Sequence, residues 1–252
     1  MELGLTGKVA VVTGGTEGIG RATALRLAQE GAQVAICARR QELLDKTAAE
    51  IRKRGADALA VAADMSKAAD VERFMKAVIE RFGRIDILIN NAGTSARGRF
   101  LEVDDRTWGA DLELKVFGAI RCTRLAVPYM KKQGGGRIIN ITISSAKQPG
   151  AESMPTSVSR AAGLAITKAL SKEYAADNIL VNTVSAGLID TDAIKHFPGR
   201  EMMLTNAKSR IPMGRLGTPE DVARVVAFLC GQDAGWIVGQ TLVADGGYSL
   251  VS

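Results

Sequence analysis

The sequence has few of the residues that build metal centres and disulfide frameworks. Its 252 residues include one histidine, His196, and three cysteines, Cys37, Cys122 and Cys230. An odd number of cysteines, far apart and set among apolar neighbours, indicates buried reduced thiols rather than a set of disulfides. No Cys/His group has the spacing of metal ligands, so we expect no metal site.

Long apolar runs and long basic runs are missing too. No apolar stretch approaches the roughly 20 residues that span a membrane, and residues 1–8 lack the basic and apolar regions of a signal peptide. The 33 Lys and Arg exceed the 27 Asp and Glu only mildly, and no basic tract is interleaved with aromatic residues. We therefore predict a cytoplasmic protein that binds neither membranes nor nucleic acids.

Short apolar runs alternate with longer helical patterns from one end of the chain to the other. Because the apolar runs are continuous rather than alternating, they predict parallel strands that are buried on both faces. The expected strands are residues 8–13, 33–38, 58–63, 85–90, 137–143, 179–184 and 241–243. The expected helices are residues 18–30, 41–54, 66–82, 106–133, 156–175 and 219–230, with Ser66 as the cap of the third.

This alternation predicts a doubly wound α/β protein in which helices cover both faces of a parallel sheet. No linker, repeat or change in composition divides residues 1–252, so we expect one domain. Residues 188–217 form the exception, because no regular pattern runs through them. So long a connection is expected to be a functional lid or to be partly disordered.

A glycine-rich turn, Thr13-Gly14-Gly15-Thr16-Glu17-Gly18-Ile19-Gly20, follows the first expected strand and leads into a helix. Glycines let the backbone approach a pyrophosphate closely, and a helix N-terminus offers free N–H groups and a positive dipole. The turn therefore indicates a dinucleotide site in a Rossmann-type fold. Its Gly-x-x-x-Gly-x-Gly spacing differs from the more common Gly-x-Gly-x-x-Gly pattern.

Together with later motifs, this spacing resembles the short-chain dehydrogenase/reductase family over essentially the whole chain. Asn90-Asn91-Ala92-Gly93 is similar to the Asn-Asn-Ala-Gly motif of the family, and Asp64 stands where the family contacts adenine. Ser185-Ala186-Gly187, followed by Thr191, resembles the segment of the family near the nicotinamide, with alanine in place of proline. The stretches 214–222 and 245–248 are also close to the C-terminal pattern of the family.

The resemblance implies a nicotinamide dinucleotide as cofactor. The residues that it places at the cofactor are Gly14, Thr16, Gly18, Ile19, Gly20, Arg39, Arg40, Asp64, Met65, Asn91, Ala92, Gly93, Arg160, Gly187, Ile189 and Thr191.

The end of the second strand favours NADP over NAD. An acidic residue there would bind the ribose 2′-OH of NAD, but this chain has Arg39 and Arg40, whose guanidinium groups suit a 2′-phosphate. Glu17 argues the other way, because many NADP-using relatives carry a basic residue at that place. We expect NADP, with NAD as the weaker alternative.

The positions that carry catalysis in the resembled family hold other residues here. Where the family has a proton-transferring tyrosine and, four residues later, a lysine, this chain has Thr156 and Arg160. The serine position falls on Ile143, and a loop shorter by one residue would bring Ser144 into its place. The asparagine that supports a water-linked proton relay is replaced by Lys115.

These replacements change the available acid–base chemistry. The hydroxyl of Thr156 is far less acidic than a phenol, although it can still donate a hydrogen bond, and Arg160 stays protonated and can hold a ribose. Lys115 can restore a lysine charge, or deliver a proton if burial lowers its pKa. Further candidate proton donors are Glu152, Lys147 and His196, each with surface exposure as its simpler explanation.

Three functions remain open from the sequence. The favoured one is an NADP-dependent oxidoreductase that transfers hydride between nicotinamide and a small carbonyl or alcohol, with an atypical proton-transfer set. The second is a cofactor-binding protein without turnover, a sensor or assembly partner. The third is non-redox chemistry of the kind found in halohydrin dehalogenases, which the intact glycine turn disfavours. The resemblance also implies a homo-oligomer, a tetramer or dimer, built through helices 106–133 and 156–175.

Overall fold

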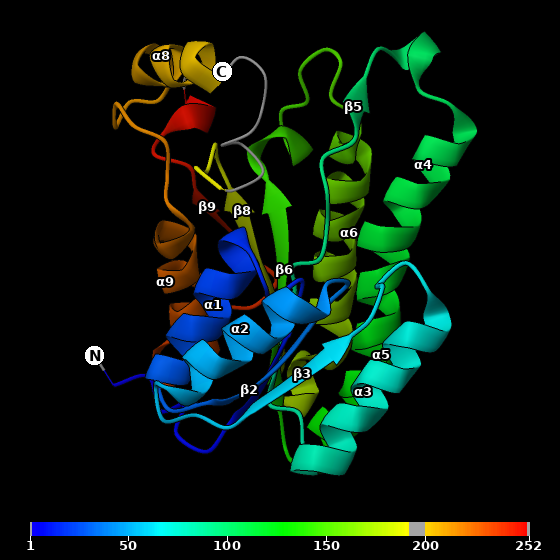
Figure 1. Ribbon diagram of the computed structural model, residues 1–252, viewed down its shortest axis with the longest axis vertical. Helices are drawn as coiled ribbons and strands as arrows, with labels where there is room; N and C mark the ends of the chain where they lie inside the picture. Colours follow the sequence, from blue (N-terminus) through cyan, green and yellow to red (C-terminus); the bar gives the residue numbers. More distant parts are fainter. Residues whose placement is uncertain (1, 192–199, 251–252) are drawn as a thin grey trace.

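A parallel sheet of seven strands forms the centre of the computed structural model, which describes residues 2–191 and 200–250 (Figure 1). The strand order is β3-β2-β1-β4-β6-β8-β9, and every neighbouring pair runs parallel. The strands are β1 (Val9–Thr13), β2 (Gln33–Ala38), β3 (Ala58–Ala62), β4 (Ile87–Asn90), β6 (Gly136–Ile143), β8 (Ile179–Ala186) and β9 (Thr241–Ala244). The order reverses between β1 and β4, the kind of place where doubly wound sheets bind ligands.

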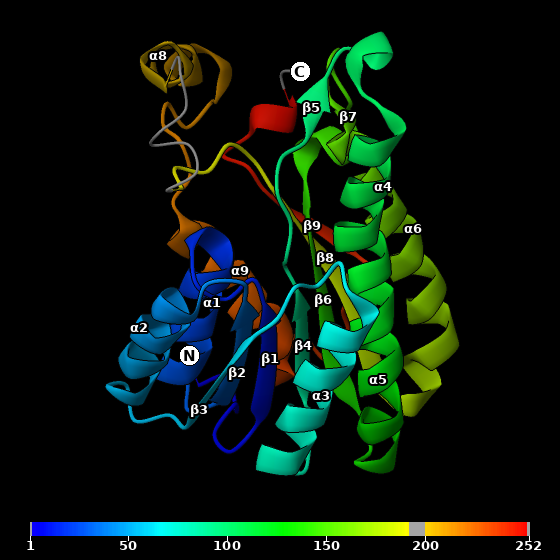
Figure 2. The ribbon, with the colours of Figure 1, turned by 45° about the vertical axis from the view of Figure 1, so that its right-hand side comes forward.

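Helices cover both faces of this sheet (Figure 2). One layer consists of α1 (Gly18–Gln29), α2 (Gln41–Arg52) and α9 (Pro219–Cys230), and the other of α3 (Ala68–Phe82), α5 (Gly118–Lys132) and α6 (Thr156–Tyr174). Alternate residues of β1 enter different cores: Ala10 and Val12 face the first layer, Val9 and Val11 the second. Burial on both faces is the reason for the continuous apolar runs of the strands, and it confirms the predicted doubly wound fold.

The long helix expected over residues 106–133 is interrupted. It consists of α4 (Asp105–Leu112), a π-helical segment (Glu113–Phe117) and α5, and the Asp104 side chain caps it by accepting from the Thr107 N–H at 2.8 Å. A π-helical segment shifts the register of the residues that follow, so one helix can present a side chain that a regular helix would aim elsewhere. The segment contains Lys115, whose side chain is 1% exposed.

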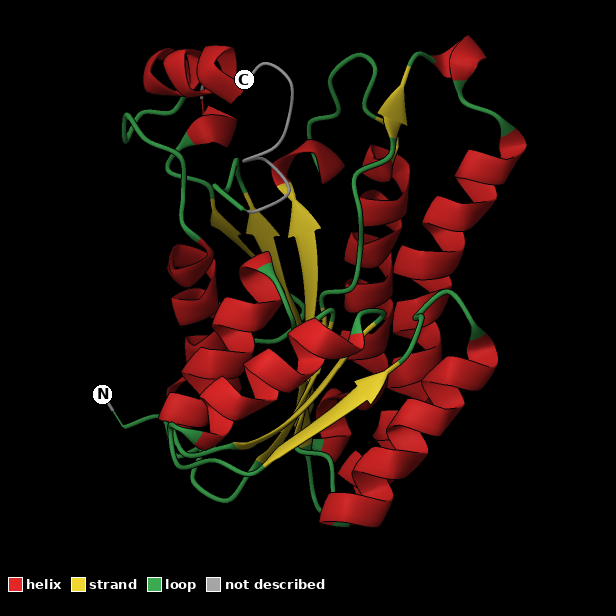
Figure 3. Ribbon diagram, viewed as in Figure 1, coloured by secondary structure: helices red, strands yellow, loops and turns green. Residues whose placement is uncertain are grey.

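Two segments contain regular elements that the sequence did not predict. Residues 188–217 contain a helix, α8 (Arg200–Arg210), beyond the carboxyl ends of the strands (Figure 3). A two-stranded antiparallel ribbon, β5 (Arg97–Gly98) with β7 (Met154–Pro155), was not predicted, because strands of two residues carry no readable alternation. His196, a candidate proton donor from the sequence, lies outside the described residues.

The start of α3 is also corrected. The helix begins at Ala68, and the N-cap residue is Lys67, which makes no side-chain capping bond. Ser66 instead donates its N–H and its hydroxyl to the Asp64 carboxylate, at 3.0 and 2.8 Å. A serine satisfied within such a turn is not available to cap the helix.

Candidate active site

The glycine turn after β1 is shaped so that only glycine fits several of its positions. Gly14 and Gly18 have φ of +66° and +50°, and a Cβ on Gly20 would lie 2.1 Å from the Gly14 carbonyl oxygen. Glu17 is the N-cap residue of α1 but makes no side-chain capping bond, and the first turn of the helix contains no acidic residue. The N–H groups and positive dipole at the start of α1 therefore remain available to an anion.

Asn91 ties this turn to the end of β4. Its amide nitrogen donates to the carbonyl oxygens of Thr13 and Gly14 at 2.9 and 3.1 Å. In return, the Thr13 hydroxyl accepts from the N–H groups of Asn91 and Ala92, both at 3.0 Å. These bonds hold the two carboxyl ends together at the point where the strand order reverses.

The segment after β8 approaches the same turn. A Cβ built on Gly18 would lie 3.2 Å from the Thr191 methyl carbon, and one on Gly187 would lie 2.5 Å from Asp245 Cβ. Ile189 is buried and forms a bridge with Gly217. The structure thus brings Gly18, which follows β1, close to Thr191, which follows β8.

Arginine side chains follow β2, as the sequence indicated, but they differ in their partners. Arg40 forms an ion pair with Glu17 across the mouth of the glycine turn. Arg39 is exposed, and no hydrogen bond or ion pair joins it to another residue of the described part of the chain. Glu17, which argued against NADP, is therefore paired with Arg40, and the Arg39 guanidinium is left available to bind a phosphate.

The remaining predicted adenine contacts sit after β3. The Asp64 carboxylate is engaged by Ser66, and the Asp64 N–H donates to Asp70 at 2.8 Å. Met65 is buried, with its sulfur 3.6 Å from the Cys37 sulfur and 3.9 Å from that of Cys122. Burial raises the pKa of the Cys122 thiol to about 12, so this sulfur cluster offers no thiolate nucleophile at neutral pH.

A buried polar cluster occupies the predicted catalytic positions. Lys115 Nζ donates to Thr156 Oγ1 at 2.8 Å and forms a close ion pair with Asp111. Ser159 Oγ donates to the second oxygen of Asp111 at 2.5 Å, and the Ala96 N–H donates to Thr156 Oγ1 at 2.9 Å. Lys115 and Thr156 were predicted from their positions, and the structure places them in direct contact.

The charge state of Lys115 is finely balanced. Burial lowers the pKa of Lys115 from 10.5 to about 8, the Arg160 charge acts in the same direction, and the Asp111 hydrogen bond opposes both. An amine with such a pKa is mostly protonated at neutral pH but can give up its proton at modest cost. This lysine can therefore act as a proton donor, which an unperturbed surface lysine cannot do well.

Arg160 lies between the polar cluster and the Asn-Asn-Ala-Gly motif. Its Nη1 donates to the Ile141 carbonyl oxygen at 2.6 Å, and a Cβ on Gly93 would lie 2.3 Å from its Nη2. Burial lowers the pKa of Arg160 to about 10. It remains a cation at neutral pH, and the absence of a side chain at Gly93 is what allows it to lie against that backbone.

A cavity of about 20 Å³ adjoins this cluster and is lined by both polar and apolar residues, of which Lys115 and Arg160 are the charged ones. Three buried atoms in its lining, Asn90 Oδ1, Thr142 Oγ1 and Arg160 Nε, have no hydrogen-bond partner among the described residues. That volume and those partners suit one water molecule. The space gives Lys115 a polar neighbour through which its proton could be exchanged.

Ser144 and the surface candidates are placed elsewhere. The Ser144 hydroxyl donates to the Ala186 carbonyl oxygen at 3.3 Å and to the Asp245 carboxylate at 3.2 Å, and no hydrogen bond joins it to Thr156 in the described part of the chain. Glu152 is exposed and bonded to Arg99 at 3.0 Å, and Lys147 is exposed. Neither of these two enters the polar cluster.

Sequence reasoning missed Asp111 and Ser159. Asp111 precedes Lys115 by four residues, a spacing that places two side chains of one helix side by side and could have suggested the pair. Ser159 is distant in sequence and gave no such signal. Its role depends on how α6 crosses the α4 end, which the sequence pattern alone does not fix.

Comparison with known proteins agrees with this geometry along nearly the full length of the chain. The family model for enoyl-(acyl carrier protein) reductase matches residues 14–249. A dehydrogenase/reductase SDR family member 4 from Oryctolagus cuniculus is 37% identical over 244 residues, which cover 96% of this chain and 94% of that protein. The chain belongs to the short-chain dehydrogenase/reductase family. As a member it is an NAD(P)-dependent oxidoreductase by type, which confirms that part of the expectation.

Solved structures of the family include cofactor complexes with both nicotinamides. L-sorbose reductase from Gluconobacter frateurii, complexed with NADPH and L-sorbose, has a TM-score of 0.94 and 35% identity, covering 99% of each chain. A 7α-hydroxysteroid dehydrogenase complexed with NADH has a TM-score of 0.93 and 31% identity, covering 98% of this chain and 96% of that one. These short-chain dehydrogenases therefore establish the cofactor class without selecting between NADP and NAD.

None of the helices in the described part of the chain is both long and apolar enough to cross a membrane. No group of three or more His, Cys, Asp or Glu side chains in residues 2–191 and 200–250 is arranged to hold a metal ion.

Proposed function

We propose that this chain is an NADP-dependent oxidoreductase for a carbonyl/alcohol pair, in which Lys115 performs the acid–base work of the missing tyrosine. The observation that carries the proposal is the 2.8 Å hydrogen bond from Lys115 Nζ to Thr156 Oγ1 inside a buried cluster. Asp111 and Ser159 hold that lysine in place. The cluster thus provides a proton donor with a lowered pKa at the catalytic position.

The dinucleotide would be held by the glycine turn and the start of α1. The free N–H groups there suit its pyrophosphate, and the shape of the turn, closed by Asn91, leaves room for close backbone approach. Arg39 would bind a ribose 2′-phosphate, while Arg40 keeps the Glu17 carboxylate neutralised. This division of labour between two adjacent arginines supports NADP over NAD.

When bound, the cofactor supplies hydride to the carbonyl carbon, and the carbonyl oxygen must then gain a proton. We assign that transfer to Thr156, whose hydroxyl proton goes to the substrate oxygen while Lys115 Nζ returns a proton to Thr156 Oγ1. Lys115 ends neutral beside Asp111 and is reprotonated through the adjoining polar cavity. Each proton moves along one hydrogen bond, so threonine needs no phenol-like acidity of its own.

Arg160 contributes charge and position rather than a proton. Its guanidinium remains cationic, touches the Gly93 backbone and is fixed by the Ile141 carbonyl. A buried cation at that place would stabilise the negative charge that develops on the substrate oxygen and would hold a ribose hydroxyl. Arg160 and Lys115 together exceed the single Asp111 charge, which favours an oxyanion in the site.

Further parts of the proposal concern access and assembly. Residues 188–217 would act as the substrate lid, because their ends are tied at Ile189 and Gly217 beside the cofactor turn. A homo-oligomer built through residues 106–133 and 156–175 is supported by the large apolar side chains that these segments expose, which are Phe117, Tyr129 and Val158.

Calorimetry followed by a turnover assay tests this function. Purified protein is titrated with NADPH and with NADH, and panels of sugar, steroid and acyl ketones are then assayed for oxidation of the bound cofactor. We expect tighter binding of NADPH and measurable turnover with at least one class. Binding without any turnover would instead support a sensor or assembly partner, and no binding of either dinucleotide would favour non-redox chemistry.

A further inference from the structure

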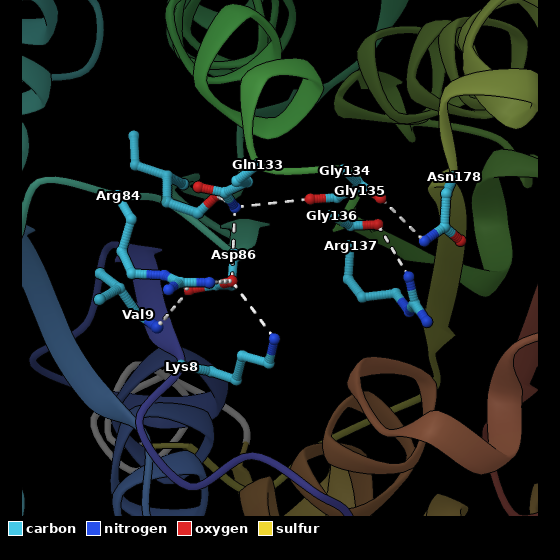
Figure 4. A network of polar contacts seen from close by, with 11 residues as sticks. Lys8, Val9, Arg84, Asp86, Gln133, Gly134, Gly135, Gly136, Arg137 and Asn178 are labelled. Carbon is cyan, nitrogen blue, oxygen red and sulfur yellow. Dashed lines mark hydrogen bonds and ion pairs between the residues drawn. The ribbon is translucent and has the colours of Figure 1, made fainter.

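The amino-terminal edge of the sheet, opposite to the cofactor turn, contains a second cavity. Its volume is about 160 Å³, which is several times the roughly 30 Å³ that a water molecule occupies. It lies at the starts of β4 and β6, beside the glycine run Gly134–Gly136 (Figure 4). The charged side chains of its lining are Lys8, Arg84, Asp86 and Arg137, three cations against one anion.

The single carboxylate is already satisfied by its neighbours. Asp86 accepts two hydrogen bonds from the guanidinium of Arg84, at 2.7 and 2.8 Å, and one from the Val9 N–H at 2.9 Å. Lys8 Nζ lies at a looser 3.6 Å from the same carboxylate. The bidentate pair therefore consumes both charges, and Lys8 retains donors for another partner.

Arg137 is the cation of this lining that forms no ion pair with any residue of the described part of the chain. Figure 4 shows its side chain directed away from the Asp86 carboxylate. Its Nη1 donates to the Gly136 carbonyl oxygen at 3.1 Å, whereas its Nε is buried and has no hydrogen-bond partner among the described residues. Burial lowers the pKa of Arg137, as expected for a guanidinium that is partly removed from water. A buried, unpaired donor on a cation is costly unless a ligand satisfies it.

We propose that this cavity binds a small doubly charged oxyanion, of which inorganic phosphate is the simplest, between Arg137 and Lys8. Three cations and one carboxylate leave two positive charges, which match a dianion. The N–H groups of Gly134, Gly135 and Gly136 are already bonded to other backbone carbonyls, so the two side chains supply the donors. The site is separate from the cofactor turn and does not depend on the proposed function.

Thermal unfolding in phosphate, with chloride at matched ionic strength as reference, tests the proposal. At ten times its dissociation constant a ligand of the native state is expected to raise the Tm of a chain of this size by about 3 °C. R137Q removes the unpaired guanidinium and should abolish that shift. R39Q is the matched control at the cofactor end: it removes the arginine that we assign to a cofactor phosphate and should keep the shift, which separates phosphate bound in this cavity from phosphate bound at the glycine turn.

The outcomes are distinct. A phosphate shift in the natural protein and in R39Q, but not in R137Q, supports the site. No shift in the natural protein, an equal shift in R137Q, or a shift lost only in R39Q overturns it. If R137Q does not fold, K8Q replaces it, because the Lys8 side chain is 43% exposed and its loss leaves the Arg84–Asp86 pair intact.

Discussion

Replacing Lys115 by methionine is the perturbation that separates the proposed proton donor from a merely structural cation. The Lys115 pKa of about 8 means that about nine-tenths of the enzyme carries the proton at pH 7 and about one-tenth at pH 9. We therefore expect kcat/KM for carbonyl reduction to fall about tenfold between these pH values, because only the protonated amine donates. K115M should lower kcat/KM by about two to four powers of ten at pH 7 and remove this pH dependence.

The same substitution also removes the cation from a buried carboxylate. An unpaired Asp111 is expected to cost about 3–5 kcal/mol of unfolding free energy, so loss of activity in K115M alone could reflect loss of folded protein. The double variant D111N/K115M removes both charges and should recover most of that stability while staying as inactive as K115M. Circular dichroism and denaturant unfolding measure the first effect, and initial rates from pH 6 to 10 the second.

The reasoning is refuted if the folded double variant keeps the kcat/KM of the natural enzyme, or if it loses activity yet keeps the fall between pH 7 and 9. The first result would mean that another group supplies the proton. The second would mean that the titrating group is not Lys115.

Three more predictions follow from the same contacts. T156V keeps the side-chain shape but removes the oxygen that accepts hydrogen bonds from Lys115 and Ala96, so carbonyl reduction should slow about a hundredfold or more in steady-state assays. T156S keeps the hydroxyl and should keep the reduction rate of the natural protein. R39Q should weaken NADPH binding by about ten- to a hundredfold in calorimetry and leave NADH unchanged, because one charge-assisted contact is worth about 1.5–3 kcal/mol. Equal loss for both cofactors would place Arg39 elsewhere. The unfolded amine keeps its proton up to pH 10.5 and the folded one releases it near 8, so stability should rise with pH in this window. Between pH 8 and 10.5 the unfolding free energy of the natural protein should rise by about 3 kcal/mol more than that of K115M, as measured by denaturant unfolding.

Much of the fold was readable because local and long-range requirements coincide. Continuous apolar runs are typical of parallel strands that are buried on both faces, so the runs that contain Val11 and Ile139 predicted the central strands. The glycine turn was readable in the same way, and the structure gives the reason for its glycines, because a Cβ on Gly20 would collide with the Gly14 carbonyl oxygen. Helix α8 and the β5–β7 ribbon were missed because they are short or have no clear apolar pattern. The structure of such segments depends on tertiary contacts, which the sequence pattern does not show.

The sequence predicted which positions form the candidate site, but it did not predict the contacts among their side chains. The order of motifs located Lys115, Thr156 and Arg160, but it could not show that the first two touch or that Asp111 holds them. The pairing of Glu17 with Arg40 was equally hidden, because it joins two turns that are separate in the chain. Charge partners across elements follow from packing geometry, which the one-dimensional pattern does not determine.

The most direct test of the account follows an isotope rather than a rate. The protein is incubated with NADPH that carries deuterium at the transferable position of the nicotinamide and, in separate reactions, with sugar, steroid and acyl ketones. We predict deuterium on the carbinol carbon of the product and natural abundance at its other positions. The folded D111N/K115M variant should form much less product. Deuterium that stays entirely in the bound dinucleotide, for every carbonyl class offered, would contradict hydride transfer at this site.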